Sequence, residues 1–84
     1  MNGMRPGLGR EEPQVYDLRG LKCPLPALRA RKALSEMKHG ELLVIECTDP
    51  LTTVDIPTLL NQTGDALEGQ ARKGKLITFR IRKM

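Results

Sequence analysis

The sequence predicts an α/β protein, a two-layer α+β sandwich in which two helices cover one face of a four-stranded mixed sheet. Two segments carry apolar residues at the three- and four-residue spacing of helices, and the remaining apolar segments alternate or run continuously as strands do. The predicted order is strand, helix, strand, helix, strand, strand, without an internal repeat. Right-handed crossovers put both helices on the same face of such a sheet. The other face is then open to solvent, in keeping with Asp17, Arg80 and Arg82.

The first strand and the first helix are separated by a short loop. Alternation of Tyr16 and Leu18 with polar neighbours predicts a short strand that ends at Gly20. A helix is expected over 24–38, closed by Gly40. The buried stripe of this helix consists of Ala27, Ala30, Leu34 and Met37 and is broadened by Leu28 and Ala33. The outer face consists of Arg29, Arg31, Lys32, Ser35, Glu36 and Lys38.

A strand and a second helix follow. Residues 41–48 are apolar on both faces, which predicts an inner strand whose last apolar residue, Cys47, is a small buried hydrophobe. The second helix ends at Thr63, and because Pro57 belongs in a first turn, its regular part is expected to begin only near Asp55. Its apolar side consists of Ile56, Leu59 and Leu60, and its candidate caps are Thr52, Thr53 and Asp55.

Two strands close the chain. A weak strand over 66–72, with Leu67 and Ala71 on one side, leads through the turn 73–75 into the last strand. The last strand has the clearest alternation, with Ile77, Phe79 and Ile81 between Thr78, Arg80 and Arg82.

Length and composition limit the class of protein. The 84 residues allow one domain over 14–84, preceded by a stretch over 1–13 that is expected to be a flexible tail. No run approaches the ~18 apolar residues of a membrane span, and no secretory signal is apparent. We therefore expect no membrane insertion and a cytoplasmic protein whose thiols are reduced.

Charge is segregated along the chain, although the net charge is only +4. Residues 41–68 hold six acidic and no basic residues, whereas 69–84 hold six basic and no acidic ones. Such segregation favours oriented docking to a partner. Tyr16 and Phe79 are the only aromatic residues, so the stacking surface of a single-strand binder is missing. We expect no direct DNA binding, and RNA contact is disfavoured.

Cys23 is the candidate reactive residue, because it directly precedes the predicted first helix. A helix start offers free N–H groups and the positive end of the dipole, both of which favour the reactive thiolate. Pro24 and Pro26 suit a first turn, which leaves Leu25 and Ala27 to direct N–H groups at the sulfur. A helix terminus contributes ~0.3–1 kcal/mol, so the expected decrease in the pKa of Cys23 is less than about one unit.

The sequence offers few other groups for chemistry. Cys47 lies 24 residues beyond Cys23, so there is no C-x-x-C pair, and His39 is the only histidine. A four-ligand zinc site of the usual Cys/His type cannot be assembled within one chain, and we expect no metal and no cofactor. Asp49 and Asp55 are expected in turns or caps and not in acid–base chemistry.

Several motifs resemble those of the TusA/SirA-like family of small sulfur-carrier proteins. They are Tyr16-Asp17-x-x-Gly20-x-x-Cys23-Pro24-x-Pro26, Arg31-Lys32, Met37-Lys38-His39-Gly40-Glu41, Asp49-Pro50 and Val54-Asp55-Ile56-Pro57. The resemblance covers roughly residues 15–83. It implies a βαβαββ sandwich in which Cys23 carries sulfane sulfur as a persulfide, supported by Pro24, Leu25 and Pro26.

The resemblance also implies partners. Sulfur would come from a cysteine desulfurase or a rhodanese-like donor and go to an acceptor protein, as in tRNA thiolation or a related sulfur-transfer pathway. Some relatives work beside membrane permeases, so an association with a membrane sulfur transporter is left open. Such a protein is a sulfurtransferase-type component and not a stand-alone enzyme. Arg19 and Lys22 add positive charge near the cysteine, and Arg31 and Lys32 either face solvent or dock the donor.

Two other functions remain open from the sequence. A regulatory or RNA- or protein-binding module would use the basic segments and make Cys23 incidental. A thiol–disulfide redox protein would need Cys47 as its resolving cysteine, since no other cysteine exists.

Overall fold

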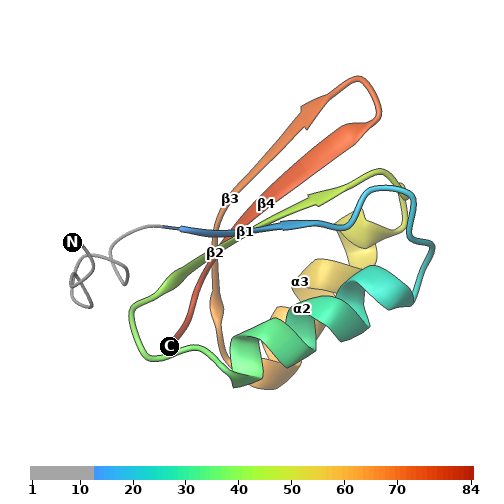
Figure 1. Cartoon of the computed structure of the whole chain (residues 1–84). Coiled ribbons are helices and arrows are strands. Elements are labelled where there is room, and N and C mark those ends of the chain that lie inside the picture. Colours follow the sequence, from blue (N-terminus) through green and yellow to red (C-terminus); the bar gives the residue numbers. More distant parts are fainter. Residues whose placement is uncertain (1–12) are drawn as a thin grey trace.

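The computed structural model describes residues 13–84 and confirms the predicted two-layer sandwich. The expected tail over 1–13 lies, except for Pro13, outside the described residues. The two helices cover one face of the sheet, and the hairpin formed by the last two strands rises away from them (Figure 1). The elements are β1 (Gln14–Asp17), α2 (Leu25–Ser35), β2 (Leu42–Cys47), α3 (Thr52–Thr63), β3 (Ala66–Lys73) and β4 (Leu76–Arg82).

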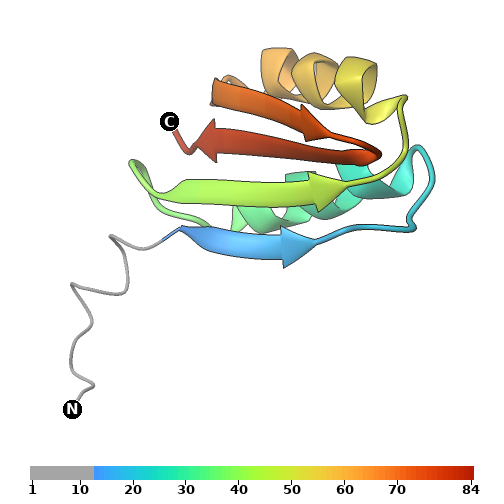
Figure 2. The same ribbon diagram turned by 90° about the horizontal axis from the view of Figure 1, so that it is seen from above.

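The sheet has the strand order β1-β2-β4-β3, which Figure 2 shows from above. β1 pairs with β2 in parallel, from Gln14 opposite Leu43 to Asp17 opposite Glu46. β2 pairs with β4 antiparallel, and β3 closes the other edge with an irregularity between Leu67 and Gly69. The parallel pair sends the chain leaving β1 and the chain leaving β2 from the same end of the sheet.

The core lies between the sheet and the helices and is almost entirely aliphatic. β2 and β4 contribute the side chains that the sequence pattern had placed inward, which confirms the inner position of β2. The most deeply buried side chains include Leu34, Leu43, Ile45, Cys47, Ile56, Ile77, Phe79 and Ile81. The outer face carries ion pairs between Arg82 and Glu68 (Nε–Oε2 2.9 Å) and between Arg19 and Asp17 (Nε–Oδ1 2.8 Å).

The first strand and first helix are shorter than predicted. β1 ends at Asp17, although the Leu18 N–H still bonds to the carbonyl of Glu46 (2.9 Å). α2 begins at Leu25 and ends at Ser35, so Gly40 does not close it. Gly40 instead makes the turn into β2 with φ of 91°. Leu28 was predicted in the buried stripe, but its side chain is exposed because it faces away from the sheet, beside α3.

The second helix starts three residues earlier than predicted. Thr52 begins α3 because the carbonyl of Asp49 accepts both its N–H (3.0 Å) and its hydroxyl (2.7 Å). The predicted caps are therefore wrong, since no side chain caps the helix start. Pro57 lies in the second turn, where it leaves the Thr53 carbonyl without its usual helical donor. The predicted end is confirmed, with Gly64 in the left-handed region.

The burial pattern yields a stability prediction. Ile45→Val removes one methylene from a fully buried site and should lower the free energy of unfolding by about 0.5–1.5 kcal/mol. Val54→Ala removes more apolar volume, but Val54 is 62% exposed on α3. Its effect should stay within about 0.5 kcal/mol, since alanine is also the better helix former. Urea unfolding of both variants measures the difference, and equal losses would contradict the proposed core.

Candidate functional site

Cys23 lies in the loop between β1 and α2, directly before the helix, and its residue is partly exposed. Its backbone N–H donates to Oδ2 of Asp49 (2.7 Å), while Oδ1 of the same carboxylate accepts the N–H of Leu51 (3.0 Å). The Gly20 N–H donates to the Thr48 hydroxyl (2.9 Å). The β2–α3 loop therefore holds the β1–α2 loop in place, and the turn role predicted for Asp49 extends to positioning Cys23.

The thiol of Cys23 donates a hydrogen bond to Oδ2 of Asp55, in the second half of the first turn of α3. This contact was not predicted from the sequence, in which Asp55 was expected to cap the helix. No pattern along the chain links two residues 32 positions apart. The only available signal was an acidic residue at the start of the helix that follows the inner strand.

The two carboxylates reverse the expected ionisation of the thiol. The pKa of Cys23 is raised above its usual value, first by the hydrogen bond to Asp55, then by loss of solvent and by the charges of Asp55 and Asp49. The expectation that the helix start would lower this pKa is therefore wrong. A terminus acts as a partial charge, whereas each carboxylate is a full negative charge, and one of them touches the sulfur. The two carboxylates therefore favour the thiol form of Cys23 over the thiolate.

The prolines and Leu25 hold the loop in a different way from the one predicted. Pro24 is the N-cap and Pro26, which is buried, is the second helical residue. The Leu25 N–H donates to the carbonyl of Lys22 (2.8 Å), so it does not point at the sulfur as expected. Within the described part of the chain the Ala27 N–H has no backbone acceptor, which leaves it as the free donor of this turn.

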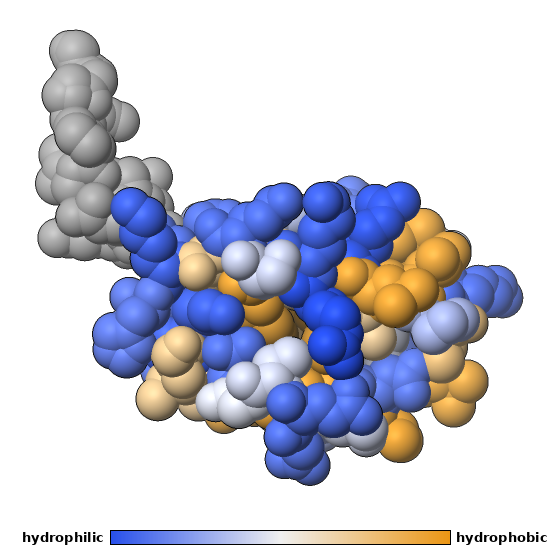
Figure 3. All heavy atoms as spheres, turned by 90° about the horizontal axis from the view of Figure 1, so that it is seen from below, coloured by the Kyte–Doolittle hydropathy of each residue, from blue (hydrophilic) through white to orange (hydrophobic). Residues whose placement is uncertain are grey.

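A groove between the two helices adjoins the thiol. Its volume is about 240 Å³, and its walls include Cys23, Asp55 and the exposed Leu28. Arg31 crosses it from α2 and donates to Oε1 of Gln62 on α3 (2.8 Å). Seen from the helix side, apolar residues gather toward the right-hand end of the molecule (Figure 3), the end where both loops lie.

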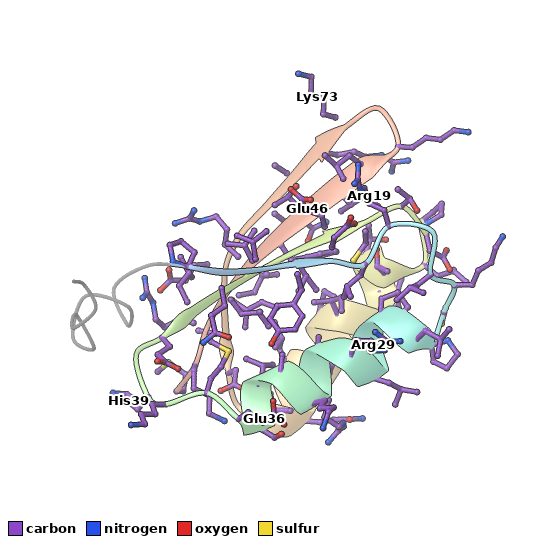
Figure 4. The ribbon with its side chains drawn as sticks, in the orientation of Figure 1. Arg19, Arg29, Glu36, His39, Glu46 and Lys73 are labelled. Atoms are coloured by element: carbon purple, nitrogen blue, oxygen red, sulfur yellow. The ribbon has the colours of Figure 1, made fainter. Side chains whose placement is uncertain are left out.

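The four predicted docking residues do not form one cluster. Arg31 lines the groove, and Lys22 is exposed next to Cys23. Arg19 lies near the end of β1 (Figure 4), and its guanidinium hydrogen-bonds Asp17 and lowers the pKa of that carboxyl to about 2. Lys32 pairs with Glu36 (3.3 Å) and lines a different hollow.

Among the described residues, the other candidate groups make no hydrogen bond to the Cys23 thiol. Cys47 is fully buried, and burial raises its pKa to about 11. Both cysteines are free, and His39 lies at the opposite end of the molecule from the β1–α2 loop (Figure 4). Over residues 13–84 no group of His, Cys, Asp and Glu is arranged to hold a metal ion. None of the helices in that range is long and apolar enough to cross a membrane.

The fold and the site together define a class: a small α/β protein that presents one accessible thiol at a helix start. Comparison with known proteins agrees with this class. The profile of the family described as Sulfurtransferase TusA matches residues 14–83, and the chain belongs to this family.

Relatives from several bacteria share most of the domain. The chain is 40% identical over 70 residues to the Sulfur carrier protein TusA of Allochromatium vinosum, covering 83% of this chain and 92% of that protein. It is 38% identical over 66 residues to a putative sulfur carrier protein of Neisseria meningitidis, covering 79% and 89% of the two chains. The putative sulfur carrier protein YrkF of Bacillus subtilis is 33% identical over 69 residues, which span 82% of this chain but 37% of that protein.

The burial of Cys47 yields a prediction about labelling. Iodoacetamide at pH 8 should modify the native protein once, at Cys23, because Cys47 is both inaccessible and held in its thiol form. The unfolded protein should be modified twice. Peptide mass spectrometry identifies the labelled cysteine, and rapid native labelling of Cys47 would show that it can reach a partner and would revive a redox function.

Proposed function

We propose that this protein is a sulfur carrier that accepts sulfane sulfur as a persulfide on Cys23 and relays it to an acceptor protein. Membership of the TusA family supports the carrier role, and relatives bear the name sulfur carrier protein. The observation that favours Cys23 is its position: it is the partly exposed cysteine, in a loop held by Asp49, at the mouth of an open groove.

The donor we propose is a cysteine desulfurase or a rhodanese-like protein that bears a persulfide. The Cys23 sulfur attacks the terminal sulfur of the donor persulfide, a new S–S bond forms on Cys23, and the donor thiolate leaves with the electrons of the broken bond. Because the sulfur keeps its oxidation state, no separate oxidant is needed.

The surface around the thiol suits a protein partner. The exposed apolar side chains that surround the two helix starts are Leu25 (44%), Leu28 (54%), Leu51 (58%) and Val54 (62%). Apolar contacts with a polar rim are typical of protein interfaces. Lys22 and Arg31 add basic groups, so we propose that the partners present an apolar surface with acidic residues at its edge.

The proposed acceptor belongs to tRNA thiolation or a related sulfur-transfer route. Cys23 must be a free thiol to accept sulfur, and thiols stay reduced in the cytoplasm, so we place the carrier there. On this proposal Cys23 is loaded with sulfur and then unloaded in each cycle of a relay, and the protein acts as a component of a sulfurtransferase system.

Mass spectrometry of the intact protein tests the carrier function. After incubation with a cysteine desulfurase and cysteine, or with a persulfide-loaded rhodanese, the wild type should gain the mass of one sulfur atom, which a reductant should remove. Cys23→Ser should gain none, and Cys47→Ser should load like the wild type. If neither donor loads the wild type, or if Cys23→Ser loads equally, the carrier function is wrong and a binding module becomes the better explanation.

A second prediction concerns the apolar surface. Leu28→Ser removes an exposed apolar side chain beside the groove and should slow loading from the donor protein by about tenfold, the effect of ~1.4 kcal/mol at an interface. Loading by inorganic polysulfide needs no interface and should change by less than about twofold. Leu67→Ser, at an exposed leucine on β3, is the matched control. Equal effects of both variants on donor loading would contradict the docking surface.

A further inference from the structure

The carboxylate of Asp55 is the one side chain that hydrogen-bonds the Cys23 sulfur among the described residues. It is partly exposed and lines the same groove as the thiol. The charged groups that face the sulfur from the surrounding elements are Asp55 on α3, Asp49 in the β2–α3 loop, Lys22 in the β1–α2 loop and Arg31 on α2. Arg31 is engaged by Gln62 and Lys22 points no donor at the thiol, so the acidic groups dominate at the sulfur.

We propose that Asp55 is a catalytic residue of sulfur transfer that holds a proton at the Cys23 sulfur in both states of the carrier. In the empty carrier it keeps Cys23 a thiol. In the loaded carrier it accepts a hydrogen bond from the terminal sulfur and keeps the group as a hydropersulfide, Cys23–S–SH. This inference rests on the proposed carrier function and identifies a second reacting group for it.

Loading balances with Asp55 as the proton acceptor. As the Cys23 sulfur attacks the outer sulfur of a donor hydropersulfide, R–S–SH, its proton moves to the Asp55 carboxylate. The bond between the two donor sulfurs breaks, and the donor leaves as R–S⁻ with the electron pair. Asp55 then returns the proton to R–S⁻ or to solvent. The products are Cys23–S–SH and R–SH, without net oxidation or reduction.

Protonation of the loaded form matters for the next step. An acceptor thiolate must attack the terminal sulfur, and a negative charge on that sulfur repels the incoming anion. A carboxylate beside the group disfavours the anionic persulfide and favours the neutral form. Attack then produces the acceptor hydropersulfide and a Cys23 thiolate, which takes a proton from solvent and restores its hydrogen bond to Asp55.

A purely structural role does not account for the orientation of Asp55. The start of α3 has no side-chain cap, and the carbonyls of Asp49, Pro50 and Leu51 accept the hydrogen bonds that hold this start. The Asp55 side chain instead reaches across to the β1–α2 loop, where its Oδ2 accepts the hydrogen bond from the Cys23 thiol.

The alkylation rate of the empty protein as a function of pH tests the first half of the proposal. Asp55→Asn keeps the size of the side chain and removes its charge. The midpoint of the pH dependence of Cys23 alkylation should therefore fall by at least about one pH unit. At a pH below the midpoint, each unit by which the pKa of Cys23 falls raises the thiolate fraction tenfold and lowers the nucleophilicity of that thiolate about threefold. Iodoacetamide should therefore react about threefold faster with Asp55→Asn than with the wild type at pH 7. Glu36→Gln changes the net charge equally at the far end of α2 (Figure 4) and should leave the midpoint unchanged.

Transfer from the loaded carrier tests the second half. Wild type and Asp55→Asn are loaded on Cys23 with inorganic polysulfide, and sulfur transfer to glutathione is followed by mass spectrometry. Transfer at pH 7 should be several-fold slower in Asp55→Asn, although its empty thiol is alkylated faster. Loss of folding would change the alkylation rate and the transfer rate in the same direction. Asp55→Ser has a shorter uncharged side chain, and it should also be alkylated faster and transfer sulfur more slowly than the wild type.

Two results would overturn the proposal: an unchanged or higher alkylation midpoint in Asp55→Asn, or transfer as fast as in the wild type. Either result, with normal loading of Cys23 by a donor protein, leaves the carrier function standing and removes Asp55 from it. A wild type that no donor loads removes the carrier function itself, so the two failures are distinguishable.

Discussion

The parallel pairing of β1 with β2 is the constraint on which the site depends. It sends the chain out of both strands at the same end of the sheet, so the loops before α2 and α3 lie together. Asp49 then reaches the backbone of Cys23, and Asp55 reaches its sulfur. The site therefore consists of two helix starts held side by side, and the groove between the helices leads to it.

Two opposing electrostatic effects act on the sulfur at this place. The positive end of α2 favours a thiolate, whereas the carboxylates of Asp49 and Asp55 favour the thiol, and the carboxylates prevail. A thiol that stays protonated at rest resists alkylation and oxidation. The low reactivity of a protonated thiol suits a carrier that must meet its donor before reacting, because its reactivity then depends on the partner.

The sequence predicted what depends on local periodicity and missed what depends on contacts between distant residues. The alternation of Ile77, Phe79 and Ile81 identified β4 correctly, and the continuous apolar run identified β2 as an inner strand. The start of α3 was misplaced because the Asp49 carbonyl, and not a side-chain cap, begins that helix. Cys23 could be singled out from its place before a helix, but its carboxylate partner becomes apparent only after folding.

The ionisation of Cys23 in the wild-type protein shows whether Asp55 or the helix start controls the sulfur. In a protein labelled with ¹³C at cysteine Cβ, the chemical shift of each cysteine reports its protonation state as the pH is raised. If Asp55 controls the sulfur, the midpoint for Cys23 lies above the value of about 8.5 for a free cysteine. A midpoint below that value would show that the helix start controls the sulfur, and it would contradict the proposed role of Asp55.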